Sequence, residues 1–319
     1  MQLAEKYKTK LQNLRDDKQF ANDRRKAARV SKKVILGLFK AVVLIGISYL
    51  ILSPLIGMIS SSFFSDSDRY NPMVYLFPAN PTLERYTMSI KVLKYGKMLL
   101  TSLIYDVSLM AIQLVICSLV GYGFARFNFP FKKVLFGCVV IMIVLPVNTI
   151  MVPLYMTFRN FGPLNLLSTP WPVVLMTLFG CGLRSGLYIY IFNQFFRGLP
   201  KEIEEAAFVD GAGMFYTYSR IMLVNAMPSV ITVSIFSLVW QYNDTFYARM
   251  FTMNADMLIS MKISSFTNTI SNSFKIIDPS ILKLYTYAGV ILMILPVMLI
   301  YVLLQKRFIE GVERSGIVG

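Results

Sequence analysis

The chain has 319 residues, of which 55% are apolar and 15% are charged, and its mean hydropathy is +0.57. A soluble domain usually carries about 25% charged residues, so this composition predicts a membrane protein and argues against a soluble one. The net charge of +15 does not indicate nucleic-acid binding, because eleven Lys and Arg residues precede Val34 at the head of a long apolar run.

Residues 1–33 predict a basic cytoplasmic tail, since a basic flank followed by an apolar run is typical of the inner side of a membrane. The apolar run is too long for a secretory signal, and no A-x-A-like cleavage site is present. Two alternatives stay open for the tail. It forms a helix lying along anionic lipid, or it is disordered.

Six apolar segments are long enough to cross a hydrocarbon core of about 30 Å as helices of roughly 20 residues. Their continuous hydrophobicity favours helices over barrel strands, which alternate apolar and polar residues. Prolines fall inside several of them, and proline is tolerated in membrane helices because neighbouring groups satisfy the freed backbone. The predicted spans are 34–62, 98–124, 133–156, 171–196, 220–243 and 285–305, and prolines inside them include Pro146, Pro153, Pro228 and Pro296.

Lys and Arg residues are more frequent in the segments on the side of the N-terminus, which predicts that both termini are cytoplasmic. The expected fold is therefore an all-α membrane protein with six transmembrane helices. Its predicted parts are the tail 1–33, the first helix with its outer loop 34–96, the transmembrane core 97–305 with a cytoplasmic loop 198–219, and a cytoplasmic C-terminal tail 306–319.

The cytoplasmic loop contains "GLPKEIEEAAFVDGAG", residues 198–213. Pro200 suits the first turn of a helix, and three glutamates follow where the positive end of the helix dipole stabilises them. Gly211 and Gly213 are expected to end this helix, since glycine adopts left-handed conformations at little cost. A second helix is expected from about Phe215 into the fifth span. The product is a short exposed helix, and the alternative is a solvated loop.

The spacing Glu205-Ala206-Ala207, three residues, Gly211, then nine residues to Ile221, resembles the EAA loop of membrane subunits from binding-protein-dependent ABC importers. The surrounding residues are similar to the version in carbohydrate permeases, such as the maltose and oligosaccharide permease subunits. The resemblance covers residues 95–319.

A second mark of that family is "FSLVWQYNDTF", which carries Asn243-Asp244. The sequence departs from the family pattern at the residue that follows Ile221-x-Leu223. The family usually has proline there, whereas this chain has Val224 and its nearest proline is Pro228. We therefore expect the fifth span to start straighter.

The resemblance implies a type I ABC importer permease fold in a bacterial plasma (inner) membrane, with an EAA helix that docks in a groove on an ATPase subunit. Implied partners are a second homologous permease, two ATPase subunits that bind ATP and Mg, an extracytoplasmic sugar-binding protein and an oligosaccharide. Nucleic acid is not among them. The residues implied to couple the chain to the ATPase are Glu204, Glu205, Ala206, Ala207, Asp210 and Gly211.

The chain itself is not expected to be an enzyme or to hold a metal or cofactor. It lacks GxxxxGK[ST], so no phosphate-binding loop for ATP is predicted. Histidine is absent, which rules out His-based triads. The cysteines Cys117, Cys138 and Cys181 lie in apolar runs without metal-ligand or disulfide spacing.

Asp106 and Arg184 fall inside apolar runs, where a lone charge costs at least about 2.5–3.5 kcal/mol. We expect them to pair with each other, to meet the second permease, or to line a water-filled path. Sugars favour aromatic faces and planar hydrogen-bonding groups. The candidate pathway residues are Asp106, Tyr188, Trp240, Tyr242, Asn243 and Asp244.

The outer segment 244–284 is long for a helix connection, and long ordered loops tend to be functional. Since the matching loop of the maltose relative reaches the sugar-binding protein, "FTNTISNSFKIID" is expected either to meet such a protein or to form a helix that seals the outer side. Two other functions stay open: an ABC permease for a non-sugar solute, and a secondary transporter, which would need an ion gradient and no ATPase.

Overall fold

The computed structural model describes residues 2–251, 253 and 257–316, with side chains described for most of residues 32–303. Over these ranges the chain is helical, and the only β-type pairing is an isolated bridge between Phe161 and Leu164. The all-α class is therefore confirmed. The chain divides into two units, residues 1–61 and 62–319.

The first unit is one helix, α1 (Gln2–Ser61), of 60 residues. Its part from Lys32 to Ser61 is apolar enough to cross a membrane, with a mean hydropathy of 2.4. The basic tail and the first predicted span therefore belong to the same helix, which favours the helical alternative for the tail. Contact of this tail with lipid stays a prediction.

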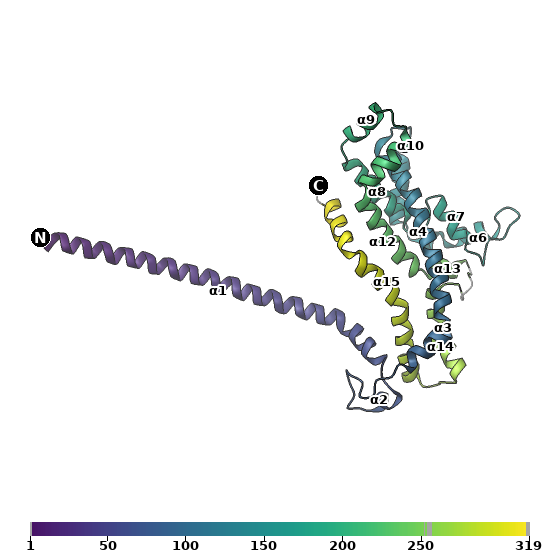
Figure 1. Cartoon of the computed structure of the whole chain (residues 1–319), viewed down its shortest axis with the longest axis horizontal. Helices are drawn as coiled ribbons and strands as arrows, with labels where there is room; N and C mark the ends of the chain where they lie inside the picture. The colour runs from purple at the N-terminus through teal and green to yellow at the C-terminus, as the bar shows by residue number, and fades with distance from the viewer. Residues whose placement is uncertain (1, 252, 254–256, 317–319) are drawn as a thin grey trace. The chain divides into compact units, whose positions relative to one another are not determined.

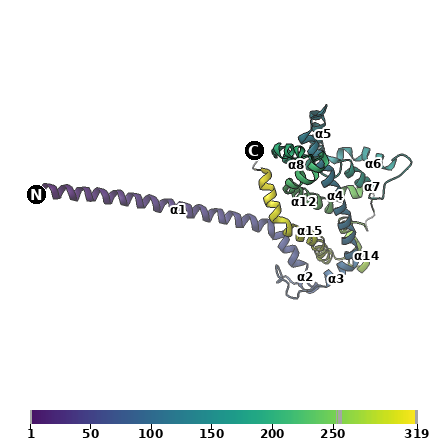
Figure 2. The same cartoon turned by 45° about the horizontal axis from the view of Figure 1, so that its top comes forward.

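The second unit is a bundle in which α4 packs against α8 and α12, and α12 packs against α15. In Figure 1, and again in the turned view of Figure 2, α12 runs beside α15. Figure 1 also places α9 and α10 at one end of the bundle and α3 and α14 at the opposite end. The helices of this unit are α2 (Asp66–Tyr70), α3 (Glu84–Leu93), α4 (Tyr95–Arg126), α5 (Lys132–Val144), α6 (Met151–Arg159), α7 (Trp171–Leu178), α8 (Ser185–Gly198), α9 (Glu202–Val209), α10 (Met214–Tyr216), α11 (Leu223–Asn225), α12 (Met227–Tyr242), α13 (Phe246–Met250), α14 (Ile259–Phe274) and α15 (Pro279–Gly316), with a 3₁₀ turn at Val147–Ile150 and a π-helical turn at Thr217–Met222.

Two of the predicted spans bend sharply. The third is broken between α5 and the 3₁₀ turn, with a bend of 104°. Leu145 and Pro146 are both extended there, because a proline forces the preceding residue out of the helical conformation. The prediction of one helix over 133–156 was therefore wrong, although Pro296 is tolerated inside α15.

The fifth predicted span bends by 78° between α11 and α12, so the expectation of a straighter start was wrong. The break falls at Ala226, and Pro228 occupies the first turn of α12. Since proline favours a helix start and opposes a helix interior, Pro228 takes the part expected of a proline at position 224.

The fourth predicted span consists of two helices, α7 and α8, separated by residues 179–184. Gly180 has a φ of +72° and Arg184 has a φ of +60°, so both residues adopt a left-handed backbone conformation that interrupts the helix. Within the described part of the chain, three helices are long and apolar enough to cross a membrane, or up to five if each bent pair counts as one span. Six spans therefore stay a prediction.

Glycine allows the closest approach in the bundle, where α4 meets α8. A Cβ atom on Gly121 would lie 2.6 Å from the Cβ of Phe192 and 3.0 Å from the backbone nitrogen of Asn193. Small residues at helix contacts let backbones pack closely in membranes. The contact belongs to a core cluster that includes Tyr122, Phe196 and Tyr218. Helix α9 packs against this cluster.

Candidate functional site

The short helix α9 forms where the sequence predicted it. The carbonyl of Lys201 accepts the backbone N–H groups of Glu204 at 3.0 Å and Glu205 at 3.1 Å, which starts the helix two residues after Pro200. The glutamates lie in its first turn, where the helix dipole favours negative charge. The predicted short helix is thus confirmed over residues 202–209.

The helix ends at Gly211 in a Schellman motif. Gly211 has a φ of +80°, its N–H bonds the carbonyl of Phe208 at 3.0 Å, and the N–H of Ala212 bonds the carbonyl of Ala207 at 2.9 Å. This geometry favours glycine at the left-handed position. Gly213 has an ordinary extended conformation with φ of −73° and ψ of 158°, so only Gly211 has the predicted terminating role.

Glu204 anchors α9 to α4 and is buried. Its Oε2 lies 3.0 Å from Nε of Arg126, and its Oε1 accepts a 2.7 Å hydrogen bond from the Tyr122 hydroxyl. Arg126 also donates to the carbonyl of Leu199 at 2.8 Å, at the entry to α9. Glu204 therefore pairs inside this chain, whereas Glu205 and Asp210 are exposed.

An aromatic cluster continues from this anchor into the bundle. The Tyr122 ring lies 5.4 Å from Phe196 on α8 and 5.2 Å from Tyr218 in the π-helical turn. The Tyr218 hydroxyl is 2.7 Å from Oγ of Ser118 on α4. These contacts connect α9 to α4, α8 and the start of the bent fifth span.

The free side of α9 and α10 is largely apolar, which the sequence reasoning missed because it concentrated on the acids. Val209 is 87% exposed and Phe215 is 74% exposed. Ala206 is exposed, while Ala207 is buried against the bundle. The sequence did contain this signal, because large apolar residues in a loop predicted to be cytoplasmic indicate a surface that binds a partner. The exposed large apolar residues here are Phe208, Val209, Met214, Phe215 and Tyr216.

Three of the predicted pathway residues lie in the interior of the bundle. Asp106, Tyr188 and Tyr242 are each no more than 2% exposed. The Tyr242 hydroxyl donates to the carbonyl of Met293 at 2.8 Å, which ties α12 to α15. One oxygen of Asp106, Oδ1, is buried with no hydrogen-bond partner among the described residues. Contact of these three residues with a substrate stays a prediction.

The other three predicted pathway residues lie at the end of α12. Trp240 and Asn243 are exposed. Asp244 is half-buried, and its Oδ1 accepts the backbone N–H groups of Phe246 at 3.1 Å and Tyr247 at 3.3 Å, so it caps the short helix α13. The Asn243-Asp244 pair therefore combines an exposed amide, whose Nδ2 donates to the carbonyl of Val239 at 2.8 Å, with one carboxylate that shapes the chain.

The sequence left open a pair between Asp106 and Arg184, and the structure separates them. Across the described side chains, no ion pair joins these two residues. The Arg184 guanidinium instead lies over the ring of Trp240, 4.4 Å from its centroid, a cation–π contact.

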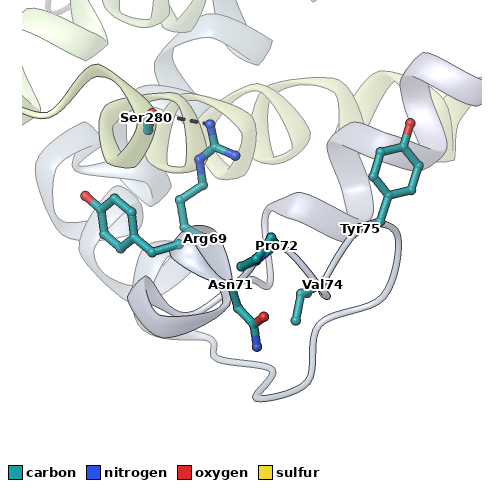
Figure 3. A pocket seen from close by; sticks show the side chains of 7 residues that line it. Arg69, Asn71, Pro72, Val74, Tyr75 and Ser280 are labelled. Carbon is teal, nitrogen blue, oxygen red and sulfur yellow. Dashed lines mark hydrogen bonds between the residues drawn. The ribbon is translucent and has the colours of Figure 1, made fainter.

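The opposite end of the bundle carries a surface hollow. A hollow of about 460 Å³ lies beside α2 and the start of α15, lined by residues that include Arg69, Asn71 and Tyr75. Figure 3 shows Arg69 reaching to Ser280, to which its guanidinium donates at 3.3 Å, with Tyr75 standing apart from Arg69.

Beside this hollow, Asp278 accepts a hydrogen bond from the Tyr70 hydroxyl. This bond, supported by the backbone N–H of Ser280 at 2.7 Å, holds the pKa of Asp278 below its usual range. The same bond raises the pKa of Tyr70.

The segment "FTNTISNSFKIID" runs through the end of α14, and its residues Phe266 and Ile270 are fully buried. They pack with Leu284 of α15 and Leu93 of α3 in one cluster. A helix is therefore observed over this segment as far as Phe274, whereas its sealing role and its contact with a binding protein both stay predictions.

Residues 98–314 match a family model described as the binding-protein-dependent transport system inner membrane component. Among known relatives, a probable ABC transporter permease of Pyrococcus horikoshii is 29% identical over 84% of this chain and 92% of its own length. The diacetylchitobiose uptake system permease protein NgcG of Streptomyces coelicolor is 26% identical over 84% of each chain. An arabinooligosaccharide transport permease, AraQ of Halalkalibacterium halodurans, is 24% identical over 86% of this chain and 93% of its own.

A solved structure has a similar fold. It is a bacterial ABC transporter involved in the import of the acidic polysaccharide alginate. One of its chains matches this one with a TM-score of 0.70 at 19% identity, over 86% of this chain and 96% of that chain.

Proposed function

Because the chain belongs to the family of binding-protein-dependent transport system inner membrane components, we propose that it is the permease subunit of an ABC importer for a sugar, in particular an oligosaccharide. Relatives named for diacetylchitobiose, trehalose and arabinooligosaccharide uptake support the choice of substrate class. Family membership implies separate ATPase and binding-protein partners. A second homologous permease completes the proposed assembly in a bacterial inner membrane, with both termini of this chain cytoplasmic and six spans.

The observation that carries this proposal is the construction of α9. One side of the helix is fixed to α4 through Glu204 and Arg126 at 3.0 Å. Its exposed C-terminal end at Val209, together with Phe215 of α10, forms an apolar end. A helix that is fixed to the bundle on one side and has an exposed apolar surface at its end is suited to transmit force from a partner to the bundle. We assign the partner-facing role to Glu205, Ala206 and the apolar end.

The remaining coupling residues act within the chain. Glu204 and Ala207 hold the helix to the bundle, Asp210 is the last residue before the turn, and Gly211 gives the turn its shape. In the proposed cycle, the ATPases move α9 when they bind ATP. The contact of Tyr122 with α8 and the π-helical turn then carries that motion into the spans.

For the pathway we propose Trp240 and Asn243 as the residues that meet the sugar, with Asp244 fixing the turn that presents them. Asp106, Tyr188 and Tyr242 are proposed to act through helix packing, because they are buried in the single chain. A permease for a non-sugar solute is the second candidate, and it predicts that sugars leave ATP hydrolysis unchanged.

A cysteine placed at Val209 tests the docking surface. In a variant with the native cysteines replaced, Val209→Cys should crosslink to the ATPase subunit, and Ala207→Cys, which is buried against the bundle, should not. The complex should copurify with a second permease and show sugar-stimulated ATP hydrolysis. Equal crosslinking at both positions, or an ATPase that never copurifies, would refute the proposed function.

A further inference from the structure

The break between α7 and α8 places irregular backbone, residues 179–184, inside a predicted span. Helix α8 has 14 residues and rises about 21 Å from its end near α9, so residues 179–184 fall well inside a core of about 30 Å. Non-helical backbone at that depth is tolerated only where it contacts protein or lines a water-filled cavity. This segment therefore does not face lipid in the assembled importer.

Two polar side chains at the break favour an aqueous over a packed environment, and the apolar Phe179 beside them is also 80% exposed. Arg184 and Cys181 are exposed in the single chain. Trp240 from α12, whose ring supports the guanidinium at 4.4 Å, is 44% exposed. An ionisable residue within a span typically marks a substrate or ion pathway.

The guanidinium is oriented but lacks an acid. No carboxylate pairs with Arg184 in the part of the chain that the structure describes, and Trp240 covers one of its faces. A planar guanidinium held in this way presents its N–H groups in a fork that matches a carboxylate with two parallel hydrogen bonds. Asn243, exposed one turn along from Trp240, adds a group suited to sugar hydroxyls.

We propose that Arg184 and Trp240 form a pathway-facing site for a saccharide that carries a carboxylate, such as a uronic acid residue. The inference rests on the proposed function and deepens it, because it names the charge class of the sugar. A neutral sugar would leave the oriented cation without a charge partner. An acid supplied by the second permease is the competing occupant, and the experiment separates the two.

The native Cys181 provides a direct reporter, since it lies three residues before Arg184. In the full importer carrying Cys117→Ser and Cys138→Ala, a charged, water-soluble maleimide should label Cys181. A trimer of galacturonic acid should slow the labelling, and its methyl-esterified, uncharged counterpart should not. The matched control retains only Cys138, which is exposed on α5, and neither sugar should change its labelling. Absence of labelling at Cys181, or equal protection by both sugars, would overturn the proposal.

Substitutions of Arg184 provide the second part of this labelling experiment. Arg184→Gln should weaken protection by the galacturonate trimer about tenfold, as expected for lost charge-assisted hydrogen bonds, and Arg184→Lys should weaken it less. Loss of the second permease from purified Arg184→Gln complexes would instead assign Arg184 to the subunit interface and overturn the inference. If the complex assembles and hydrolyses ATP normally but neither sugar protects Cys181, this inference fails while the proposed function stands.

Discussion

Replacing Glu204 with alanine is expected to destabilise the chain by about 3–5 kcal/mol, because it leaves the buried guanidinium of Arg126 without its carboxylate. The two side chains are only 7% and 10% exposed, and their charged groups lie 3.0 Å apart. The small values typical of surface ion pairs, about 0–1 kcal/mol, therefore do not apply. Glu204→Gln should cost less, since its amide oxygen still accepts the hydrogen bond from Tyr122.

The pair is best measured as a double-mutant cycle in mixed micelles, with the free energy of unfolding obtained from circular dichroism. We expect Glu204→Ala and Arg126→Met together to cost less than the sum of the single changes, with a coupling of about 1.5–3 kcal/mol. The single variants each leave a buried charge, whereas the double variant leaves none. Additivity within about 0.5 kcal/mol would show that the pair does not hold α9 to α4.

Glu205→Ala is the matched control for this cycle. Glu205 is adjacent in sequence and exposed, so its removal should change the free energy of unfolding by less than about 0.5 kcal/mol. If Glu205 faces the ATPase, the same variant should lower sugar-stimulated ATP hydrolysis. A destabilisation equal to that of Glu204→Ala would contradict the assignment of the two acids to different sides of α9.

Two further predictions concern backbone conformation and acid sensitivity. Gly211→Val should destabilise α9 by about 1–2 kcal/mol, because Gly211 has φ of +80° and a left-handed backbone penalises L-residues. Gly213→Val, at φ of −73°, should leave thermal unfolding of the purified complex nearly unchanged, and equal losses at both positions would refute the reasoning. For pH, the pKa of Asp278 is lowered in the fold by Tyr70, so this carboxylate stabilises the fold above its unfolded pKa of about 3.9. That contribution is lost as the pH falls through the folded pKa. Tyr70→Phe should therefore reduce the acid dependence of unfolding below about pH 4, and an unchanged profile would argue against the Tyr70 contact.

Local signals in the sequence were sufficient for α9. Glutamates in the first turn and a glycine after the last turn act through neighbouring backbone groups, so their effect does not depend on the rest of the fold. The same local chemistry was underestimated elsewhere. Pro146 was treated as tolerated within a span, yet the structure bends by 104° beside it. Hydropathy reports how apolar a segment is and carries no information on where its helix ends.

By itself, the sequence determined the membrane class, the helical content and the exposed helix that ends at Gly211. These follow from composition and from interactions between residues a few positions apart. The tertiary structure alone decided that Glu204 faces inward to Arg126, 78 positions earlier in the chain, while Glu205 faces outward, and that Arg184 rests on Trp240 instead of pairing with Asp106. Such choices depend on which helices pack together, because a side chain's partner is set by the contact between helices and not by its neighbours along the chain.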